Sequence, residues 1–245
     1  MIEIKHESQR GLPPTQQVYE EIYLREGISM HDSFYLWLIS LLNPEPGSLL
    51  LDISCGEGKL VGFSTLKGVK SIGIDFSANA VYKGYLKSPK SSWIIGDGEA
   101  LPLSSACADY VMHIGSLEHY LNPLNGMAEI ARVLKPMGKA CVLLPNSYGL
   151  FGNIKYVWKT GHVYDDGQPL QRYNTKVGWE QMLISQGLSI YKVVKYEREW
   201  PVVRKDILWL MMHPLKMLRS FFTWFIPLNL SNCFVYLCTP SKTFQ

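Results

Sequence analysis

The stretch Leu49-Leu50-Leu51-Asp52-Ile53-Ser54-Cys55-Gly56-Glu57-Gly58-Lys59-Leu60 joins an apolar run to an acid, a turn of small residues and a new helix pattern. Residues 49–53 fit a strand that is buried on both faces. Gly56 and Gly58 let the backbone turn tightly and approach a ligand without a Cβ in the way. A helix that begins near Lys59 would aim its free N–H groups at the same ligand. The stretch therefore predicts a nucleotide-like cofactor at the end of the first core strand.

The glycine spacing separates this turn from two other nucleotide-binding turns. A dinucleotide fingerprint needs G-x-G-x-x-G, but Val61 stands where the third glycine belongs and Gly62 comes one residue late. A phosphate loop needs a glycine five residues before its Gly-Lys pair, and Ile53 stands there. The spacing therefore disfavours both an NAD-dependent oxidoreductase and a phosphate-loop protein.

Four further motifs follow the opening stretch in the order of a known family. Residues 71–77 read as a second buried strand ending in an acid, 96–102 as a polar loop, 108–114 as a strand, and 131–138 as a helix end leading into another strand. Together they resemble the class I S-adenosylmethionine-dependent methyltransferases, and most of all the methyltransferase type 11 group of ubiquinone and menaquinone biosynthesis. The resemblance covers roughly residues 45–145.

The resemblance implies an α/β fold: a doubly wound, Rossmann-like, seven-stranded sheet whose last strand is antiparallel and pairs at the sheet's edge. We expect strands near 49–53, 71–75, 92–96, 108–114, 139–145, 188–196 and 233–238, and helices near 58–66, 78–86, 124–134 and 176–186. The length fits a single domain over 1–245, with an N-terminal helical cap (1–44), a cofactor-binding core (45–145) and two insertions (146–175 and 199–231). Helices near 15–26 and 32–42 should form the cap.

The resemblance also implies S-adenosyl-L-methionine as the cofactor and S-adenosyl-L-homocysteine as its product. Asp75 would accept hydrogen bonds from the ribose hydroxyls, and the loop that holds Asp97 would contact the adenine. Ser54 departs from the family pattern, which commonly has glycine there, and we expect its hydroxyl to bond the turn's own backbone. The residues that the motifs place at the cofactor are Asp52, Ser54, Cys55, Gly56, Gly58, Asp75, Phe76, Asp97, Gly98, Glu99, His113 and Ile114.

The turn after the fourth strand holds the candidates for catalysis. The methyl carbon on a sulfonium is already electrophilic, so its transfer needs alignment more than an elaborate apparatus. If the acceptor is a hydroxyl, His119 and Glu118 are the candidates to take its proton, and a purely structural role for His119 is the alternative. Ubiquinone O-methyltransferases, which this turn resembles, are thought to bind a divalent ion here with two glutamates and a histidine. Gly115 stands in place of the first glutamate, so we predict no metal.

Charge and cysteine content bound the partners and the compartment. The formal net charge is +3, without a long basic block, and no Asp/Asn-Pro-Pro-aromatic motif follows the fourth strand, so nothing indicates nucleic acid. The five cysteines form no C-x-x-C pair, and the first residues lack the apolar stretch of a secretory signal. We therefore expect a cytoplasmic protein with a small-molecule or lipid-linked acceptor and no nucleic-acid partner.

Two segments outside the minimal fold are expected to hold the acceptor. Residues 146–175 are rich in glycine and aromatics, which suits a stacking platform for a flat acceptor or an ordinary packed loop. In 204–229, a helix opening at Pro214 would separate an apolar side from a cationic side. The apolar side would hold Leu215, Leu218, Phe221, Phe222, Phe225 and Ile226, and the other side Lys216, Arg219, Ser220 and Thr223. Apolar stripes usually mean packing, so we expect a lid first, then a peripheral membrane contact through 214–226 at the inner face of a membrane, and last a transmembrane span.

Three functional hypotheses follow from these observations. The first is a methyltransferase that passes a methyl group by in-line displacement to a quinone, sterol, sugar or similar acceptor. The second is a non-catalytic partner protein that binds S-adenosylmethionine, and Ser54 is the residue that suggests it. The third is an NAD-dependent oxidoreductase, against which the position of Gly62 argues.

Overall fold

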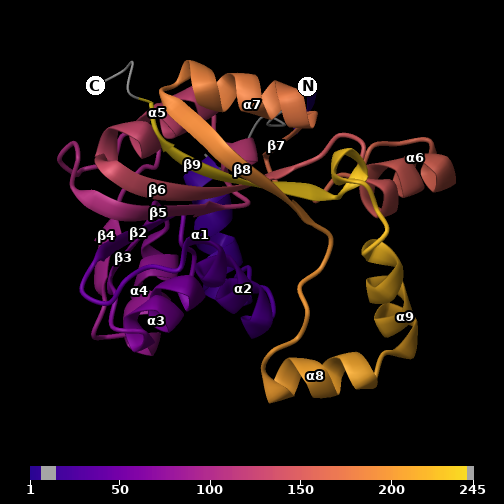
Figure 1. The fold of residues 1–245 in the computed structure, drawn as a ribbon, viewed down its shortest axis with the longest axis horizontal. Helices are drawn as coiled ribbons and strands as arrows, with labels where there is room; N and C mark the ends of the chain where they lie inside the picture. Colours follow the sequence, from indigo (N-terminus) through magenta and orange to yellow (C-terminus); the bar gives the residue numbers. More distant parts are fainter. Residues whose placement is uncertain (7–14, 242–245) are drawn as a thin grey trace.

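A computed structural model of the protein describes residues 1–6 and 15–241, and its centre is a seven-stranded sheet with helices on both faces (Figure 1). In spatial order the strands are β4 (Ser92–Ile95), β3 (Lys70–Asp75), β2 (Leu49–Ile53), β5 (Ala108–Ile114), β6 (Leu134–Pro145), β9 (Cys233–Pro240) and β8 (Leu188–Tyr196). Neighbouring strands are parallel from β4 to β6, whereas β9 is antiparallel to both β6 and β8. The predicted α/β sheet with an antiparallel last strand is confirmed.

The position of β9 differs from the prediction, because β9 lies between β6 and β8 and the edge strand is β8. The burial of the two strands accounts for this order. Almost every residue of β9 is buried, whereas β8 alternates buried, half-buried and exposed residues. A strand whose two faces are both apolar is stable only inside the sheet. Since β8 is parallel to β2, its carboxyl end lies at the same edge as the glycine turn.

Two layers of helices bury the two faces of the sheet. Leu51 and Ile53 point to the face covered by α5 (Pro123–Val133) and α7 (Lys176–Ser185). Leu50 points to the opposite face, which α2 (Asp32–Leu42) and α3 (Lys59–Leu66) cover. The alternation follows from the period of two along a strand. β2 is therefore buried on both faces, as its apolar run predicts.

The N-terminal cap is helical only in part. The expected helices are present as α1 (Thr15–Arg25) and α2, but β1 (Ile2–Lys5) pairs antiparallel with β7 (Leu170–Tyr173). The prediction of an all-helical cap is wrong at this point, because Ile2 and Ile4 alternate with polar residues as in a half-exposed strand. Residues 7–14 of the cap and 242–245 of the predicted domain lie outside the described residues.

The remaining helices stand at the carboxyl edge of the sheet. After β6 come a turn of π-helix (Leu150–Ile154) and α6 (Lys155–Thr160), and between β8 and β9 come α8 (Arg204–Met211) and α9 (Pro214–Thr223). We call residues 204–226 the α8–α9 arm, which Figure 1 shows standing off the body of the protein. The predicted helix opening at Pro214 is confirmed. Among the described residues no helix is both long and apolar enough to cross a bilayer.

Candidate functional site

The glycine turn after β2 takes its shape from three residues with left-handed backbone. The φ angles of Ser54, Gly56 and Gly58 are 56°, 53° and 66°, a region that costs little only for glycine. A Cβ on Gly58 would lie 2.0 Å from the Trp93 ring, so a larger residue would displace that ring. The backbone N–H of Gly56 donates to Asp75 Oδ2 at 2.8 Å, which ties the turn to the end of β3.

Ser54 keeps its left-handed conformation with the help of a side chain that we did not predict. Its hydroxyl lies 2.7 Å from the Tyr120 hydroxyl, and not on the turn's own backbone, so that expectation is wrong. The Tyr120 hydroxyl also lies 2.9 Å from Nε2 of the buried His113. Burial lowers the pKa of His113 to about 3, so its ring is neutral at physiological pH. Tyr120 therefore links the glycine turn to the end of β5.

The carboxyl group of Asp75 is buried and partly satisfied by backbone. Ser77 N–H donates to its Oδ1 at 2.9 Å, and Gly56 N–H donates to its Oδ2. Burial raises the pKa of Asp75 to about 6, and the nearby Glu20 carboxylate raises it further while the backbone donors oppose the shift. Each oxygen still has a free lone pair, so Asp75 can accept the two ribose hydroxyls that the resemblance assigns to it.

Asp52 is buried and accepts no hydrogen bond from the residues that the structure describes. Burial, together with the charge of Asp75, raises its pKa well above the ordinary value. A buried acid without a donor is costly unless a cation or a hydrogen-bond donor meets it. S-adenosylmethionine carries an ammonium and a sulfonium, so the two acids at this edge fit its cationic half and its ribose.

Helix α1 covers the glycine turn. The sequence motifs alone do not predict this contact. A Cβ on Gly56 would meet the Tyr23 hydroxyl at 2.7 Å, so α1 lies directly against the turn. Glu20 accepts hydrogen bonds from the N–H groups of Ala78 and Asn79, at 2.6 and 3.0 Å, and so caps α4 (Ala78–Lys87). Phe76, a predicted cofactor residue, packs against Tyr19 of the same helix. Tyr19 and Tyr23 lie on one side of α1, and this aromatic side is the sequence signal that the helix packs against the core.

The other predicted cofactor residues lie around the same edge. Asp97 is exposed, and its Oδ1 accepts the N–H of Glu99 at 2.9 Å, while Glu99 itself accepts the N–H of Asn122. Gly98 leaves room for Tyr120, because a Cβ there would lie 1.9 Å from the Tyr120 hydroxyl. Burial raises the pKa of the Cys55 thiol, and Ile114 ends β5 half-buried.

His119 and Glu118 lie together on the short 3-10 turn Leu117–His119, with Asp166 from the first insertion beside them. His119 Nδ1 lies 2.6 Å from the carbonyl oxygen of Leu170, so it must be the protonated nitrogen. Nε2 is 3.9 Å from both Glu118 Oε1 and Asp166 Oδ2, too far for a hydrogen bond. Burial raises the pKa of Glu118, and its Oε2 has no partner among the described residues. The Nε2 lone pair is therefore free to accept a proton between two carboxyl groups.

Tyr19 connects this cluster to the cofactor residues. Its hydroxyl donates to Gln168 Oε1 at 2.6 Å. Burial raises its pKa, and the charges of Asp166, Glu118 and Asp75 raise it further. Tyr19 is thus close enough to Asp75, Glu118 and Asp166 for their charges to act on it, so the three carboxyl groups lie at one end of the sheet.

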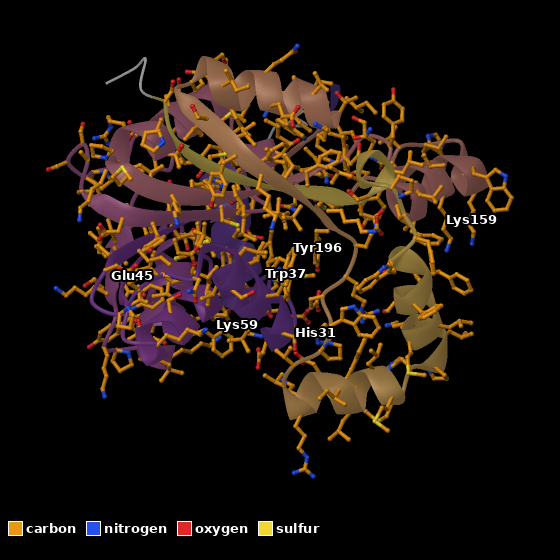
Figure 2. The ribbon with its side chains drawn as sticks, in the orientation of Figure 1. His31, Trp37, Glu45, Lys59, Lys159 and Tyr196 are labelled. Atoms are coloured by element: carbon orange, nitrogen blue, oxygen red, sulfur yellow. The ribbon has the colours of Figure 1, made fainter. Side chains whose placement is uncertain are left out.

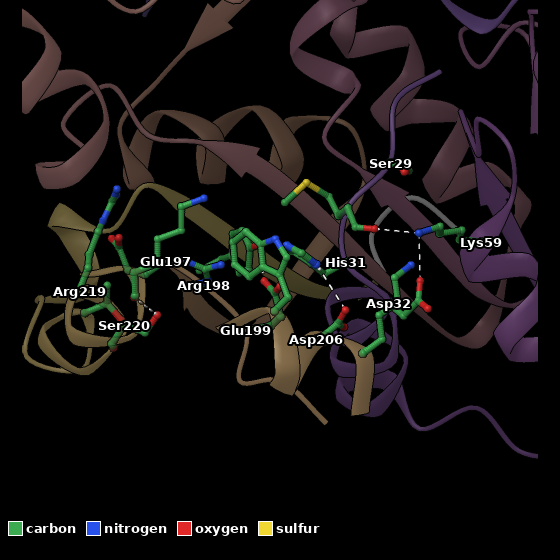
Figure 3. Close-up of a pocket in the computed structure, with 16 residues that line it drawn as sticks. Ser29, His31, Asp32, Lys59, Glu197, Arg198, Glu199, Asp206, Arg219 and Ser220 are labelled. Atoms are coloured by element: carbon green, nitrogen blue, oxygen red, sulfur yellow. Dashed lines mark hydrogen bonds and ion pairs between the residues drawn. The ribbon is translucent and has the colours of Figure 1, made fainter. Parts of the chain in front are cut away.

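A pocket of about 620 Å³ opens beside the glycine turn, between the cap and the α8–α9 arm (Figure 3). Lys59, the first residue of α3, lies on its wall and binds Asp32 Oδ1 at 3.0 Å. Figure 2 shows Tyr196, at the carboxyl end of β8, beside Trp37 of α2, and the two rings stack with centroids 5.4 Å apart. The arm contributes most of the opposite wall. The second insertion therefore reaches the edge of the sheet that carries the glycine turn, and its role at the acceptor stays a prediction.

Comparison with known proteins relates this chain to methyltransferases. Residues 51–142 match the family model described as a methyltransferase domain. The chain is 27% identical over 174 residues to the tRNA (carboxymethyluridine(34)-5-O)-methyltransferase ALKBH8 of Mus musculus, covering 69% of this chain and 25% of that protein. It is 36% identical over 113 residues to the chloroplastic 2-methyl-6-phytyl-1,4-hydroquinone methyltransferase of Spinacia oleracea, covering 41% and 32%. The chain thus spans less than two thirds of these relatives.

Solved structures share the fold. A chain in the complex of the Haloferax volcanii Trm112 methyltransferase activator with its methyltransferase gives a TM-score of 0.60 at 16% identity, covering 92% of this chain and 94% of that one. The Haemonchus contortus phosphoethanolamine N-methyltransferase 2, solved with S-adenosylhomocysteine, gives 0.57 at 15% identity, covering 85% and 52%. The motifs, the sheet order and the match over residues 51–142 together identify a methyltransferase domain in this chain, with the fold of S-adenosylmethionine-dependent methyltransferases.

Proposed function

We propose that the protein transfers a methyl group from S-adenosylmethionine to an oxygen of a small or lipid-linked acceptor, with His119 taking the proton. The observation that carries this proposal is the free Nε2 of His119, whose other nitrogen is fixed by Leu170 and which two carboxyl groups flank. As the acceptor oxygen attacks, its bond to the methyl carbon forms, the carbon–sulfur bond breaks, and the proton passes to Nε2. Glu118 and Asp166 would stabilise the resulting imidazolium.

The class of acceptor is inferred from a relative and from the pocket beside the glycine turn, whose lining does not include His119. A hydroquinone methyltransferase is among the relatives, and such an acceptor is a ring hydroxyl compound with an apolar tail. The pocket beside the glycine turn has a volume suited to a small or lipid-linked molecule. A tRNA methyltransferase is also among the relatives, so the expected absence of a nucleic-acid partner stays a prediction. A cytoplasmic location completes the proposal.

The proposal is tested by replacing His119 and measuring transfer of a labelled methyl group into a lipid extract. The His119→Gln variant should lose roughly 10²–10⁴-fold in kcat, because the proton then has no acceptor in reach. Its affinity for S-adenosylhomocysteine should match the parent's. His162→Gln, an exposed histidine of the first insertion, is the control and should turn over normally. Equal turnover of His119→Gln and parent would remove the base from the mechanism.

A further inference from the structure

The α8–α9 arm turns its polar side toward the protein and its apolar side toward solvent. Ser220 and Thr223 are buried, and they line the pocket together with Lys216 and Arg219. Leu215 of α9 and Phe225, two residues after its end, are 82% and 70% exposed. The arm covers the pocket as a lid would, but it does so with its polar side. The apolar side, which a lid is expected to bury, faces solvent. The predicted division of the two sides is therefore correct except for Ile226, which is buried, and its direction is reversed.

Polar anchors at both ends hold the arm in this orientation. At its start, Asp206 is buried, its Oδ2 accepts the Ser33 N–H at 2.8 Å, and its Oδ1 lies 3.3 Å from His31 Nδ1. At its end, Lys195 Nζ donates to the carbonyl oxygens of Thr223, Trp224 and Ile226, at 3.2, 2.6 and 2.7 Å. Turning the apolar side inward would break these bonds. The outward apolar side is thus built into the fold.

The exposed apolar side is continuous along both helices. Its members are large and at least half exposed: Leu208, Met211, Met212, Leu215, Leu218, Phe221, Phe222, Trp224 and Phe225. The neighbouring α6 adds Trp158, which is 82% exposed. Arg219 of α9 contacts the turn before α6, because its guanidinium lies 5.0 Å from the Phe151 ring centroid. Soluble monomers rarely expose a contiguous apolar patch of this kind, so the patch marks an interaction surface for a protein or a membrane.

The charge of the arm points to the nature of that cover. Residues 204–226 hold Arg204, Lys205, Lys216 and Arg219 against a single acid, so the arm alone accounts for the formal net charge of +3 of the whole chain. Within the described residues none of these four cations pairs with a carboxylate. α6 brings two more cations, Lys155 and Lys159, the second of which stands at the outer end of this surface in Figure 2.

The carboxylates of the pocket do not offset this excess of cations. Glu197 accepts hydrogen bonds from the backbone and side-chain N–H groups of Asn232, and burial raises its pKa to about 7. Glu199 accepts the Tyr196 hydroxyl at 2.8 Å, and Asp32 pairs with Lys59. Each of these acids therefore has a partner of its own, and no ion pair to a carboxylate holds the four cations of the arm within the described residues.

We propose that the α8–α9 arm docks the protein on an anionic membrane surface. Its apolar side enters the boundary between head groups and acyl chains, while the Lys and Arg side chains at its flanks meet lipid phosphates. An amphipathic helix of this composition lies in the plane of a membrane, and tryptophans favour its interface. Arg204, Lys205, Lys216 and Arg219 are exposed on the same two helices as the apolar patch, a combination that suits anionic lipid. A lipid surface therefore fits both the apolar and the cationic part.

The dock explains why the pocket lies where it does. The pocket is bounded by the inner side of the arm and by Lys59, which follows the glycine turn directly. A lipid-linked acceptor could thus pass from the membrane to the methyl donor without its tail crossing water. Docking itself goes beyond the proposed function and does not depend on methyl transfer, so either can fail without the other.

Flotation of the purified protein with lipid vesicles tests the dock. The parent should float with vesicles of phosphatidylcholine mixed with phosphatidylglycerol, much less with phosphatidylcholine alone, and less as salt is added. A triple variant, Phe221→Ser with Phe222→Ser and Phe225→Ser, should partition at least about a hundredfold more weakly, because three phenyl rings lose their burial. The Lys205→Glu and Lys216→Glu double variant should lose the preference for the anionic vesicles.

The control carries three equally exposed apolar residues on α3 and α4, changed as Leu66→Ser, Tyr82→Ser and Leu86→Ser. It should float like the parent. Affinity for S-adenosylhomocysteine, measured by calorimetry, should be the same in all variants and shows that they fold. A parent that stays with the unbound protein at low salt, or a triple Phe variant that floats like the parent, would overturn the dock. The proposal would also be overturned if the parent formed a dimer that the Phe substitutions dissociate, and if neither the parent nor the variant bound vesicles.

Discussion

The sheet core and the α8–α9 arm are both rich in apolar residues, yet the core buries them and the arm exposes them. In β2 the apolar side chains of Leu50, Leu51 and Ile53 are fully buried. In α9 the apolar side chains are exposed while Ser220 and Thr223 are buried. Hydrophobic periodicity gives the two sides of an element, whereas its direction depends on anchors such as Asp206 and Lys195, which come from outside the periodic segment.

The largest effect is expected from truncating one leucine in each region. Leu51→Ala removes a side chain from the sheet core and should lower the free energy of unfolding by about 2–5 kcal/mol. Leu218→Ala, on the outer side of the arm, should change it by less than about 0.5 kcal/mol in water. Urea unfolding measures both. A comparable loss at Leu218 would mean that the arm packs its apolar side after all.

The glycine turn gives the next largest contrast. Gly58→Ala combines left-handed backbone strain with a Cβ placed into the Trp93 ring, and should cost about 2–4 kcal/mol. Gly161→Ala carries the strain alone, since nothing lies within 4 Å of its Cβ, and should cost about 1–2 kcal/mol. Unfolding and S-adenosylhomocysteine titration should show that only Gly58→Ala also weakens the cofactor. Equal costs would show that Trp93 yields freely.

Removing the Tyr120 hydroxyl should have an intermediate effect. Tyr120→Phe leaves the buried His113 and the strained Ser54 without their common partner, which should cost about 1–3 kcal/mol of stability. Tyr82→Phe, an exposed tyrosine of α4, is the matched control and should be neutral. Thermal unfolding of the two variants decides the matter, and a neutral Tyr120→Phe would reduce this link to simple packing.

The smallest expected effect is a pH dependence of cofactor affinity. If Asp75 accepts the ribose hydroxyls as an ionised carboxylate, affinity for S-adenosylhomocysteine should fall about tenfold from pH 7 to about pH 5 as Asp75 takes up a proton. The sign for stability is opposite, because a raised pKa makes the ligand-free protein lose stability as pH rises between about 4 and about 6. Calorimetry across this range should give a flat profile for Asp75→Asn. A sloping profile in that variant would assign the titration to another group.

Much of the core could be predicted from sequence because the determinants are local. The buried run at 49–53, the glycines of the turn and the acid that ends β3 each act where they stand in the chain. The sequence alone does not predict that β8, and not β9, is the edge strand. That order depends on how deeply each of the two strands is buried relative to the other. Tyr120 and Tyr23 were missed for the same reason, since each acts on a turn more than thirty residues away in the sequence.

The measurement that tests the central claim most directly is the fate of a labelled methyl group. The parent protein is incubated with methyl-labelled S-adenosylmethionine and a cell extract, which is then divided into an organic-solvent fraction and an RNA fraction. We predict label in the organic fraction, on a compound with a newly methylated oxygen. Label in the RNA fraction, or no transfer at all, would contradict a small or lipid-linked acceptor.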